Sequence, residues 1–250
     1  MGILHFIWIF LRKRSFPKVG NVDAVCPYCN NTLEKKPGRK KKCPSCNNFI
    51  YVRTRPKDGK KVLVTREQTE ILEEQWSIVN GTHAQFLRNK RIIENERRSL
   101  AKKFGREPSE NDIRWSLLNK DLMAHARNAN WGLYRNAKFQ MAEILRNKSK
   151  TSPALATYLE VLYIDVNGPN NTGGIRDRDL LKEFPPFNKK DGFLAPGVLS
   201  RAAKLIQELK LDDKGTRVIF DKIAERNFTN LRLPVTPKQG WRKIKKELFT

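Results

Sequence analysis

The sequence predicts an α+β fold that is mainly α, with a small N-terminal β-hairpin unit followed by a multi-helix region. Three observations support this prediction. Two Cys-x-x-Cys pairs precede a short β-branched and aromatic run, Phe49–Arg53, which is typical of a strand. From Thr65 onward, apolar residues recur at helical intervals. The chain has 250 residues, of which 39% are hydrophobic, so it can bury a real core in one or two domains.

The chain begins with an apolar and basic segment and a linker, expected over residues 1–21. Residues 1–11 are apolar almost without interruption and are followed by Arg12, Lys13 and Arg14. The run is too short to cross a bilayer, and its basic residues follow the apolar run, whereas those of a signal peptide precede it. Two hypotheses stay open. Residues 2–11 dock on the protein's own core or on a partner, or residues 2–14 contact a membrane surface.

All four cysteines of the chain belong to the two Cys-x-x-Cys pairs, which are thirteen residues apart: Cys26, Cys29, Cys43 and Cys46. Each pair places two sulfurs on one side of a tight knuckle, and a hairpin that joins two knuckles can close a tetrahedron around Zn²⁺. Four thiolates leave no open coordination position, so the pattern predicts one structural zinc ion. The alternatives are two disulfides or a redox dithiol. Both are disfavoured, because nothing marks the chain as secreted and no βαβ pattern surrounds either pair.

The residues around the cysteines match a known pattern. Proline follows the first cysteine of each pair, a basic segment with Pro37-Gly38-Arg39 joins the pairs, and the strand-like Phe49–Arg53 follows Asn47. With these features, residues 22–65 resemble a zinc ribbon. Asn47 stands where such knuckles often have Gly, but Asn tolerates the left-handed conformation of the turn. The resemblance implies a bound metal ion and, less specifically, a nucleic acid, the transcription machinery or another protein as partner.

The chain is strongly basic. Its formal net charge is +24, from 50 Lys and Arg against 26 Asp and Glu. Residues 1–59 carry 13 basic and 3 acidic side chains, so positive charge is most concentrated at this end. A charge of this size attracts polyanions over a long range. Nucleic acid is the polyanion that the charge favours, followed by an anionic membrane surface; a basic surface that is only solvated is the alternative.

The most basic stretch, residues 35–42, lies between the two cysteine pairs and contains Pro37-Gly38. Pro-Gly favours a turn, so we expect the cations to fan out at a hairpin tip, where they could neutralise phosphates. Three aromatic residues nearby could stack on unpaired bases or pack beneath the hairpin: Tyr28, Phe49 and Tyr51. The predicted nucleic-acid contacts are Lys35, Lys36, Arg39, Lys40, Lys41, Lys42, Arg53 and Arg55.

Residues 66–165 are expected to form a helical domain. Thr65-Arg-Glu-Gln68 has the spacing of a capping box, and the helix that it begins stops near Asn80-Gly81. Further helices are predicted at His83–Phe104, after a Ser109 cap, after a break at residues 128–130, and from Ser152. The apolar face of the His83–Phe104 helix is expected to consist of Phe86, Leu87, Ile93, Leu100 and Phe104.

Residues 166–250 are expected to form a C-terminal, mostly helical region. The polar loop at 165–174 is the best candidate for a domain boundary. Asp165, Asn167 and Asn170 imitate part of a calcium loop, but the bidentate Glu is missing, so we interpret the loop as a turn. Helices are predicted at 178–184, at 196–211 and after a Thr236 cap, whereas 216–226 fits a helix or a strand.

Few features point to catalysis. The sequence has no glycine-rich phosphate loop, no His-Glu-x-x-His and no serine elbow, and a zinc site would occupy all four thiols. One enzymatic hypothesis stays open, a nuclease whose carboxylates meet only in the fold, for example Asp165, Asp177 or Asp179.

Two hypotheses of function follow. In the first, the protein is a non-catalytic zinc-binding protein that holds DNA or RNA through the basic hairpin and basic helices. In the second, it is a zinc-stabilised protein-interaction adaptor whose charge is incidental or serves contact with a membrane. Both hypotheses place it in the cytoplasm, because reduced thiols are needed for metal binding, and peripheral membrane association stays open.

Overall fold

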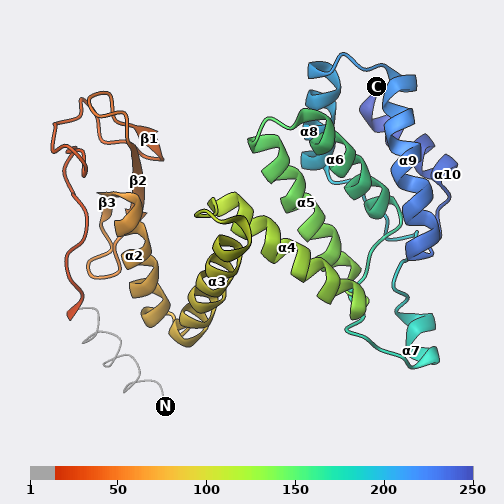
Figure 1. Cartoon of the computed structure of the whole chain (residues 1–250), viewed down its shortest axis with the longest axis horizontal. Coiled ribbons are helices and arrows are strands. Elements are labelled where there is room, and N and C mark those ends of the chain that lie inside the picture. Colours follow the sequence, from red (N-terminus) through yellow and green to blue (C-terminus); the bar gives the residue numbers. More distant parts are fainter. Residues whose placement is uncertain (1–14, 250) are drawn as a thin grey trace. The chain divides into compact units, whose positions relative to one another are not determined.

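The computed structural model describes residues 15–249, so the apolar and basic segment expected at residues 2–14 lies outside the described residues. The α+β, mainly α prediction is confirmed, because a small antiparallel sheet precedes the helices α2 to α10 (Figure 1). The chain divides into two compact units between Asn95 and Glu96. Within residues 15–249 no helix combines the length and the apolar character that crossing a membrane requires.

The sheet of the first unit has the order β1-β2-β3. Its strands are β1 (Lys41–Lys42), β2 (Phe49–Thr54) and β3 (Lys61–Val64). β1 pairs with β2 with Lys42 opposite Phe49, and the residues between these two strands are the second cysteine pair. The tip of this hairpin is therefore the Cys43–Cys46 knuckle. The expected hairpin tip at Pro37-Gly38 is instead part of a loop that leads into β1.

Helix α2 (Arg66–Val79) packs on β2 and β3 and so belongs to the first unit. The indole N–H of Trp76 donates to the carbonyl of Thr54 at 2.8 Å. Between the helix and the sheet lies a small cluster of buried side chains: Val19, Val62, Val64 and Leu72. These contacts connect residues on the two sides of the boundary expected at residue 65.

Helix α3 (His83–Phe104) has the predicted bounds, but most of its apolar face is exposed. Leu100 is buried, at 7% exposed. Phe86 is half-buried, and four large apolar side chains are 42–52% exposed: Leu87, Ile92, Ile93 and Phe104. The helix contains the point at which the two units divide, so it is the segment through which the chain passes from one unit to the other.

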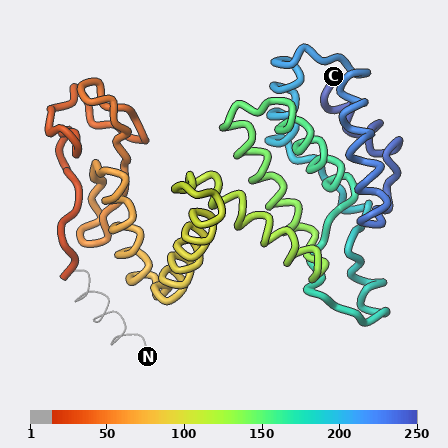
Figure 2. The backbone as a smooth tube through the Cα atoms, in the orientation of Figure 1, coloured from red at the N-terminus to blue at the C-terminus, as the bar shows by residue number. Residues whose placement is uncertain are grey.

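The second unit is built around α6 (Thr151–Val166), which is mostly apolar and is buried on all sides over its second half. Both tyrosines of this helix, Tyr158 and Tyr163, are fully buried. A helix of this kind is stable only when other elements enclose it, and α5, α8, α9 and α10 all pack against it (Figure 2). The other helices of this unit are α4 (Glu110–Arg127), α5 (Trp131–Asn147), α7 (Arg178–Glu183), α8 (Pro196–Glu208), α9 (Asp213–Leu231) and α10 (Pro237–Leu248). The ambiguous residues 216–226 are thus helical.

Helix α10 approaches α6 closely because Gly240 has no side chain. A Cβ atom at Gly240 would lie 2.7 Å from a ring carbon of Tyr163. The hydroxyl of the same tyrosine donates to the carbonyl of Val235 at 2.6 Å, just before α10. Tyr163 therefore fixes both the depth and the direction of the last helix.

The polar loop at 165–174 lies inside the second of the two compact units. Asn167 is fully buried, donates to the carbonyl of Tyr163 at 2.7 Å and accepts from the backbone N–H of Val235 at 2.8 Å. Asp165 accepts two hydrogen bonds from Arg135, at 2.6 and 2.7 Å. The residues that imitate a calcium loop are thus held by their own chain, in agreement with the turn interpretation.

Candidate metal centre

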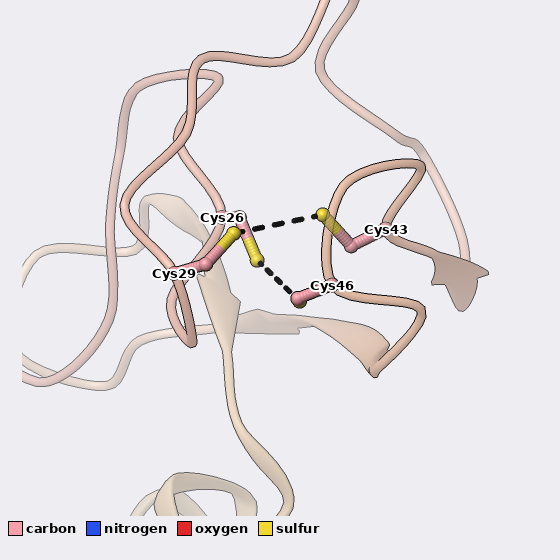
Figure 3. A group of neighbouring side chains, drawn as sticks. All are labelled: Cys26, Cys29, Cys43 and Cys46. Carbon is pink, nitrogen blue, oxygen red and sulfur yellow. Dashed lines mark hydrogen bonds between the residues drawn. The ribbon is translucent and has the colours of Figure 1, made fainter.

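The sulfurs of Cys26, Cys29, Cys43 and Cys46 lie within 4.8 Å of one another (Figure 3). Two of the separations are 3.8 Å, from Cys26 to Cys46, and 3.9 Å, from Cys29 to Cys43. Four sulfurs about 2.3 Å from a central ion, at the corners of a tetrahedron, stand about 3.8 Å apart. Disulfide-bonded sulfurs would stand only about 2.05 Å apart. The spacing therefore fits a metal ion, and the four thiols are free.

The two cysteine pairs are shaped by the same backbone turn. In the first, the N–H of Asn30 donates to the carbonyl of Cys26 at 3.0 Å; in the second, the N–H of Asn47 donates to that of Cys43 at 3.0 Å. Both asparagines are left-handed, with φ of 59° and 58°. Asn47 takes the conformation that its place in the knuckle predicts. Asn30 plays the same part in the first knuckle, and its position after a Cys-x-x-Cys pair is the signal that could have identified it.

The electrostatics of the site favour a bound cation. The backbone N–H groups of Cys46 and Ser45 help to lower the pKa of Cys43 to about 6. Although the backbone N–H of Asn31 opposes the change, burial and the neighbouring thiols raise the pKa of Cys29 to about 12. Like charges this close disfavour one another, so the four thiols cannot all ionise alone. A metal ion would hold them as thiolates, and binding it would release protons.

The core beneath the sulfurs is small. Two of the cysteines are buried in it with three aliphatic side chains: Cys26, Cys43, Leu33, Ile50 and Leu63. Leu63 comes from β3 and Ile50 from β2, so the sheet forms the floor of the site. We call residues 22–65, which carry the site, the cysteine module.

Most of the predicted nucleic-acid contacts are exposed on the cysteine module. They are Lys35, Arg39, Lys40, Lys41, Lys42 and Arg53. Lys36 is different, because its ammonium donates to the carbonyls of Val22 at 2.5 Å and Lys61 at 2.7 Å. Lys36 therefore anchors the loop to the sheet, and the exposed cations on either side of it remain at the surface.

Arg55 does not extend the basic surface, because its side chain is buried. The residue is 4% exposed, and its guanidinium donates to both carboxylate oxygens of Asp58, at 3.0 and 2.6 Å. It also donates to the carbonyl of Val19 at 3.3 Å. The hydrogen bonds from Arg55 hold the pKa of Asp58 at about 2. The sequence alone does not distinguish Arg55 from the nearby Arg53. Only the fold shows that the Arg55 side chain is buried against Asp58.

The three aromatic side chains near the basic run have different environments. Tyr28 packs against the buried cysteines, and its hydroxyl accepts from the backbone N–H of Arg66 at 3.0 Å. Tyr51 is half-buried, and Phe49 is 43% exposed. Tyr28 thus supports the module from within, whereas Phe49 and Tyr51 reach its surface.

The carboxylates considered for a nuclease do not come together. Among the described residues, the four cysteines are the one group of three or more potential metal ligands that lie close enough to share an ion. Asp165 is paired with Arg135. Asp177 caps α7 by accepting from the backbone N–H groups of Asp179 and Leu180, both at 3.0 Å.

Comparison with known proteins adds no further assignment. No family model, curated protein or solved structure is significantly similar to the chain. The candidate site is therefore defined by its own geometry.

Proposed function

We propose that the chain is a non-catalytic zinc-binding protein that binds nucleic acid through the exposed cations of its cysteine module. Zn²⁺ is the proposed ion, because four thiolates at tetrahedral spacing suit its borderline-soft character. A closed set of four thiolates leaves no position for water or substrate, so the proposed role of the ion is structural. Thiol ligation requires a reducing compartment, and the proposal places the protein in the cytoplasm.

The main support for this proposal is the position of three lysines on the hairpin of the cysteine module. The first strand of this hairpin consists of Lys41 and Lys42, and Lys40 directly precedes it. The tip of the hairpin is the second cysteine knuckle. A metal ion would hold that hairpin rigid, so the cations would be presented in a fixed array. Such an array binds a polyanion with a smaller loss of side-chain and loop freedom than a flexible tail does. Each neutralised phosphate also releases counterions, which adds affinity at low salt.

The proposal is tested by measuring affinity against salt concentration, using the full chain loaded with Zn²⁺ and oligomers of DNA and RNA. Replacing Lys40, Lys41 and Lys42 by Gln should reduce the slope of log affinity against log salt by about 2 to 3, at about 0.7 to 0.9 per phosphate contact. The matched control replaces three exposed lysines of α3, Lys90, Lys102 and Lys103, with the same change in net charge. Equal effects of the two triple variants would show that net charge alone determines binding.

A protein-interaction adaptor is the second candidate, and the exposed apolar side chains of α3 favour it. This function predicts weak nucleic-acid binding that the triple Lys→Gln variant leaves unchanged. It also predicts a protein partner that copurifies and stays bound after nuclease treatment. Membrane contact by residues 2–14 is a separate proposal. It predicts binding to anionic lipid vesicles that disappears when residues 2–11 are deleted.

A further inference from the structure

One face of the hairpin combines exposed rings with cations. Phe49, Tyr51 and Arg53 alternate along β2 and therefore point to the same side of the sheet. Lys42 is opposite Phe49 in the neighbouring strand, and Lys40 precedes it by two residues, so both reach this side. Ile50 points to the other side and is buried, at 1% exposed. We call Lys40, Lys42, Phe49, Tyr51 and Arg53 the aromatic–basic face.

The cations of this face lie directly over its rings. The ammonium of Lys40 is 4.2 Å from the ring centroid of Phe49 and 5.0 Å from that of Tyr51. The ammonium of Lys42 is 5.3 Å from the Phe49 ring. The guanidinium carbon of Arg53 is 5.9 Å from the Tyr51 ring. Each ring thus has two cations beside it, and Phe49 is the more exposed of the two rings, at 43%.

We propose that the aromatic–basic face binds single-stranded nucleic acid, with unpaired bases stacked on Phe49 and Tyr51 and neighbouring phosphates held by Lys40, Lys42 and Arg53. This inference rests on the proposed function and specifies its substrate class. Any base has a flat surface that can stack, so the site is selective for unpaired bases and tolerant of sequence.

The backbone of β2 separates the rings of Phe49 and Tyr51 by enough for each to stack on a different base. Residues two apart on a strand are separated by about 6.6 to 6.8 Å, so each ring has room for its own base. Tyr51 also packs against the cluster between the sheet and α2. Phe49 follows the second cysteine knuckle after only two residues. Both rings are therefore held in place before a ligand arrives, which lowers the entropy lost on binding.

A base can displace the lysine from a ring. An exposed cation over an aromatic ring contributes a factor of about 2 to 5 to an equilibrium. Stacking of a base on an aromatic side chain contributes a factor of about 5 to 150. The base therefore gains the ring surface, and the flexible lysine stem allows its ammonium to move to a phosphate. The displaced cation keeps an electrostatic partner, so the exchange favours the bound state.

Duplex nucleic acid cannot use the rings in this way. In a duplex the faces of the bases are covered by their neighbours, and exposing them requires unstacking. A duplex can still use the cations, because its phosphates are on the outside. The aromatic–basic face should therefore bind both forms electrostatically but prefer the single strand.

The test measures the affinity of the Zn²⁺-loaded full chain for four ligands of equal length: oligo(dT), an abasic oligomer with the same backbone, oligo(U) and a DNA duplex. The variants are Phe49→Leu and Tyr51→Leu, which keep apolar bulk and remove the ring. Lys41→Gln is the matched control, because Lys41 is opposite Ile50 and points away from the aromatic–basic face. Zinc content and circular dichroism verify that each variant is folded.

If the inference is correct, the wild-type chain binds oligo(dT) or oligo(U) at least about 5-fold more tightly than the abasic oligomer and the duplex. Each ring variant loses about 5-fold or more in affinity for the single strand with bases and stays within about 2-fold for the abasic one. Lys41→Gln leaves the ratio of the two affinities unchanged, since it removes a positive charge and no ring.

Three results would overturn the inference. Equal binding of all four ligands, or ring variants that leave the preference for bases unchanged, would refute stacking and leave the proposed nucleic-acid binding intact. Failure of the wild-type chain to bind any of the four ligands would refute both.

Discussion

The two units of the chain differ in what holds them together. In the first unit, two small clusters of five and four buried residues lie on either side of the sheet, and one of them contains two of the cysteines. In the second unit, a cluster of nineteen buried residues is built on α6, and a further cluster of five lies between α4 and α5. Apolar burial stabilises a fold roughly in proportion to the area removed from water. The second unit therefore has a large apolar core of its own, whereas the first has little buried apolar surface apart from its cysteine site.

This difference separates two kinds of sequence information. A metal site needs a few residues of one type at fixed spacing, so it can be recognised from a short segment. A helical core needs many interchangeable apolar residues whose partners are far away in the chain. The predictions below test the contrast between the two units, beginning with the largest effect.

Removal of the metal ion should unfold the cysteine module and leave the helices around α6 intact. Structural zinc contributes about 10 to 16 kcal/mol of apparent binding free energy in small modules, more than the stability of a typical domain. Hydrogen exchange measured with and without a chelator should show loss of protection in residues 22–65 and unchanged protection in 151–166. Loss of protection in both segments would mean that the two units do not fold independently.

Shortening one buried side chain of α6 should destabilise the second unit and leave the cysteine module unchanged. Leu159 is fully buried in the core of the second unit, so Leu159→Ala should reduce its free energy of unfolding by about 2 to 5 kcal/mol. Denaturant unfolding measures this loss, and the metal content of the variant should not change. Val218→Ala is the control, because Val218 is 71% exposed on α9 and should change stability by less than about 0.5 kcal/mol.

Removal of a helix cap should reduce stability by a similar and smaller amount in each unit. Thr65 at the start of α2 and Ser109 at the start of α4 each accept a hydrogen bond from the backbone N–H three residues on, in complete capping boxes. Thr65→Ala and Ser109→Ala should each cost about 1 kcal/mol, measured by thermal unfolding of the metal-loaded chain. A far larger loss for Thr65→Ala would show that the junction of β3 and α2 also supports the metal site.

The smallest expected effect is the loss of stability of the second unit when Asp112 is protonated at low pH. Hydrogen bonding to Ser109 and the ammonium of Lys148 hold the pKa of Asp112 at about 2, below the ordinary value near 3.9. Because the folded pKa is the lower one, this stabilisation is present above pH 4 and is lost as the pH falls from about 4 to about 2. Asp112→Asn should flatten the pH dependence of the second unit in that window, measured by denaturant unfolding. A variant of the exposed Asp179, Asp179→Asn, serves as the control.

The first unit should respond to acid differently. Asp58 has a similarly lowered pKa, but protons also compete with the metal ion for the four thiolates. The cysteine module should therefore lose its metal and unfold at a higher pH than the one at which Asp112 titrates. Simultaneous loss of both units would contradict this order.

Local features were predictable because their signals are local. The two cysteine knuckles, the left-handed Asn47 and the capping boxes at Thr65 and Ser109 each depend on residues within a few positions of one another. The bounds of α3 were predicted for the same reason, from a helical repeat that ends at Gly105. None of these features requires knowledge of what the segment packs against.

Other features depended on distant contacts. The sequence assigns Leu87, Ile93 and Phe104 to an apolar face, but it does not show that this face is exposed. It shows Arg55 as a cation but not its burial against Asp58 and the carbonyl of Val19. The same applies to the hairpin tip, because the pairing of β1 with β2 selects the second knuckle over the Pro37-Gly38 turn.

The sequence by itself determined the four thiols, the caps that begin helices and the excess of positive charge, since composition and spacing are properties of the chain alone. The tertiary structure decided which cations and rings remain at the surface, and so which of them are free to meet a ligand. Burial is the sum of contacts between residues far apart in the chain. The pairing of strands and the packing of α2 on the sheet are the interactions that set it in the first unit.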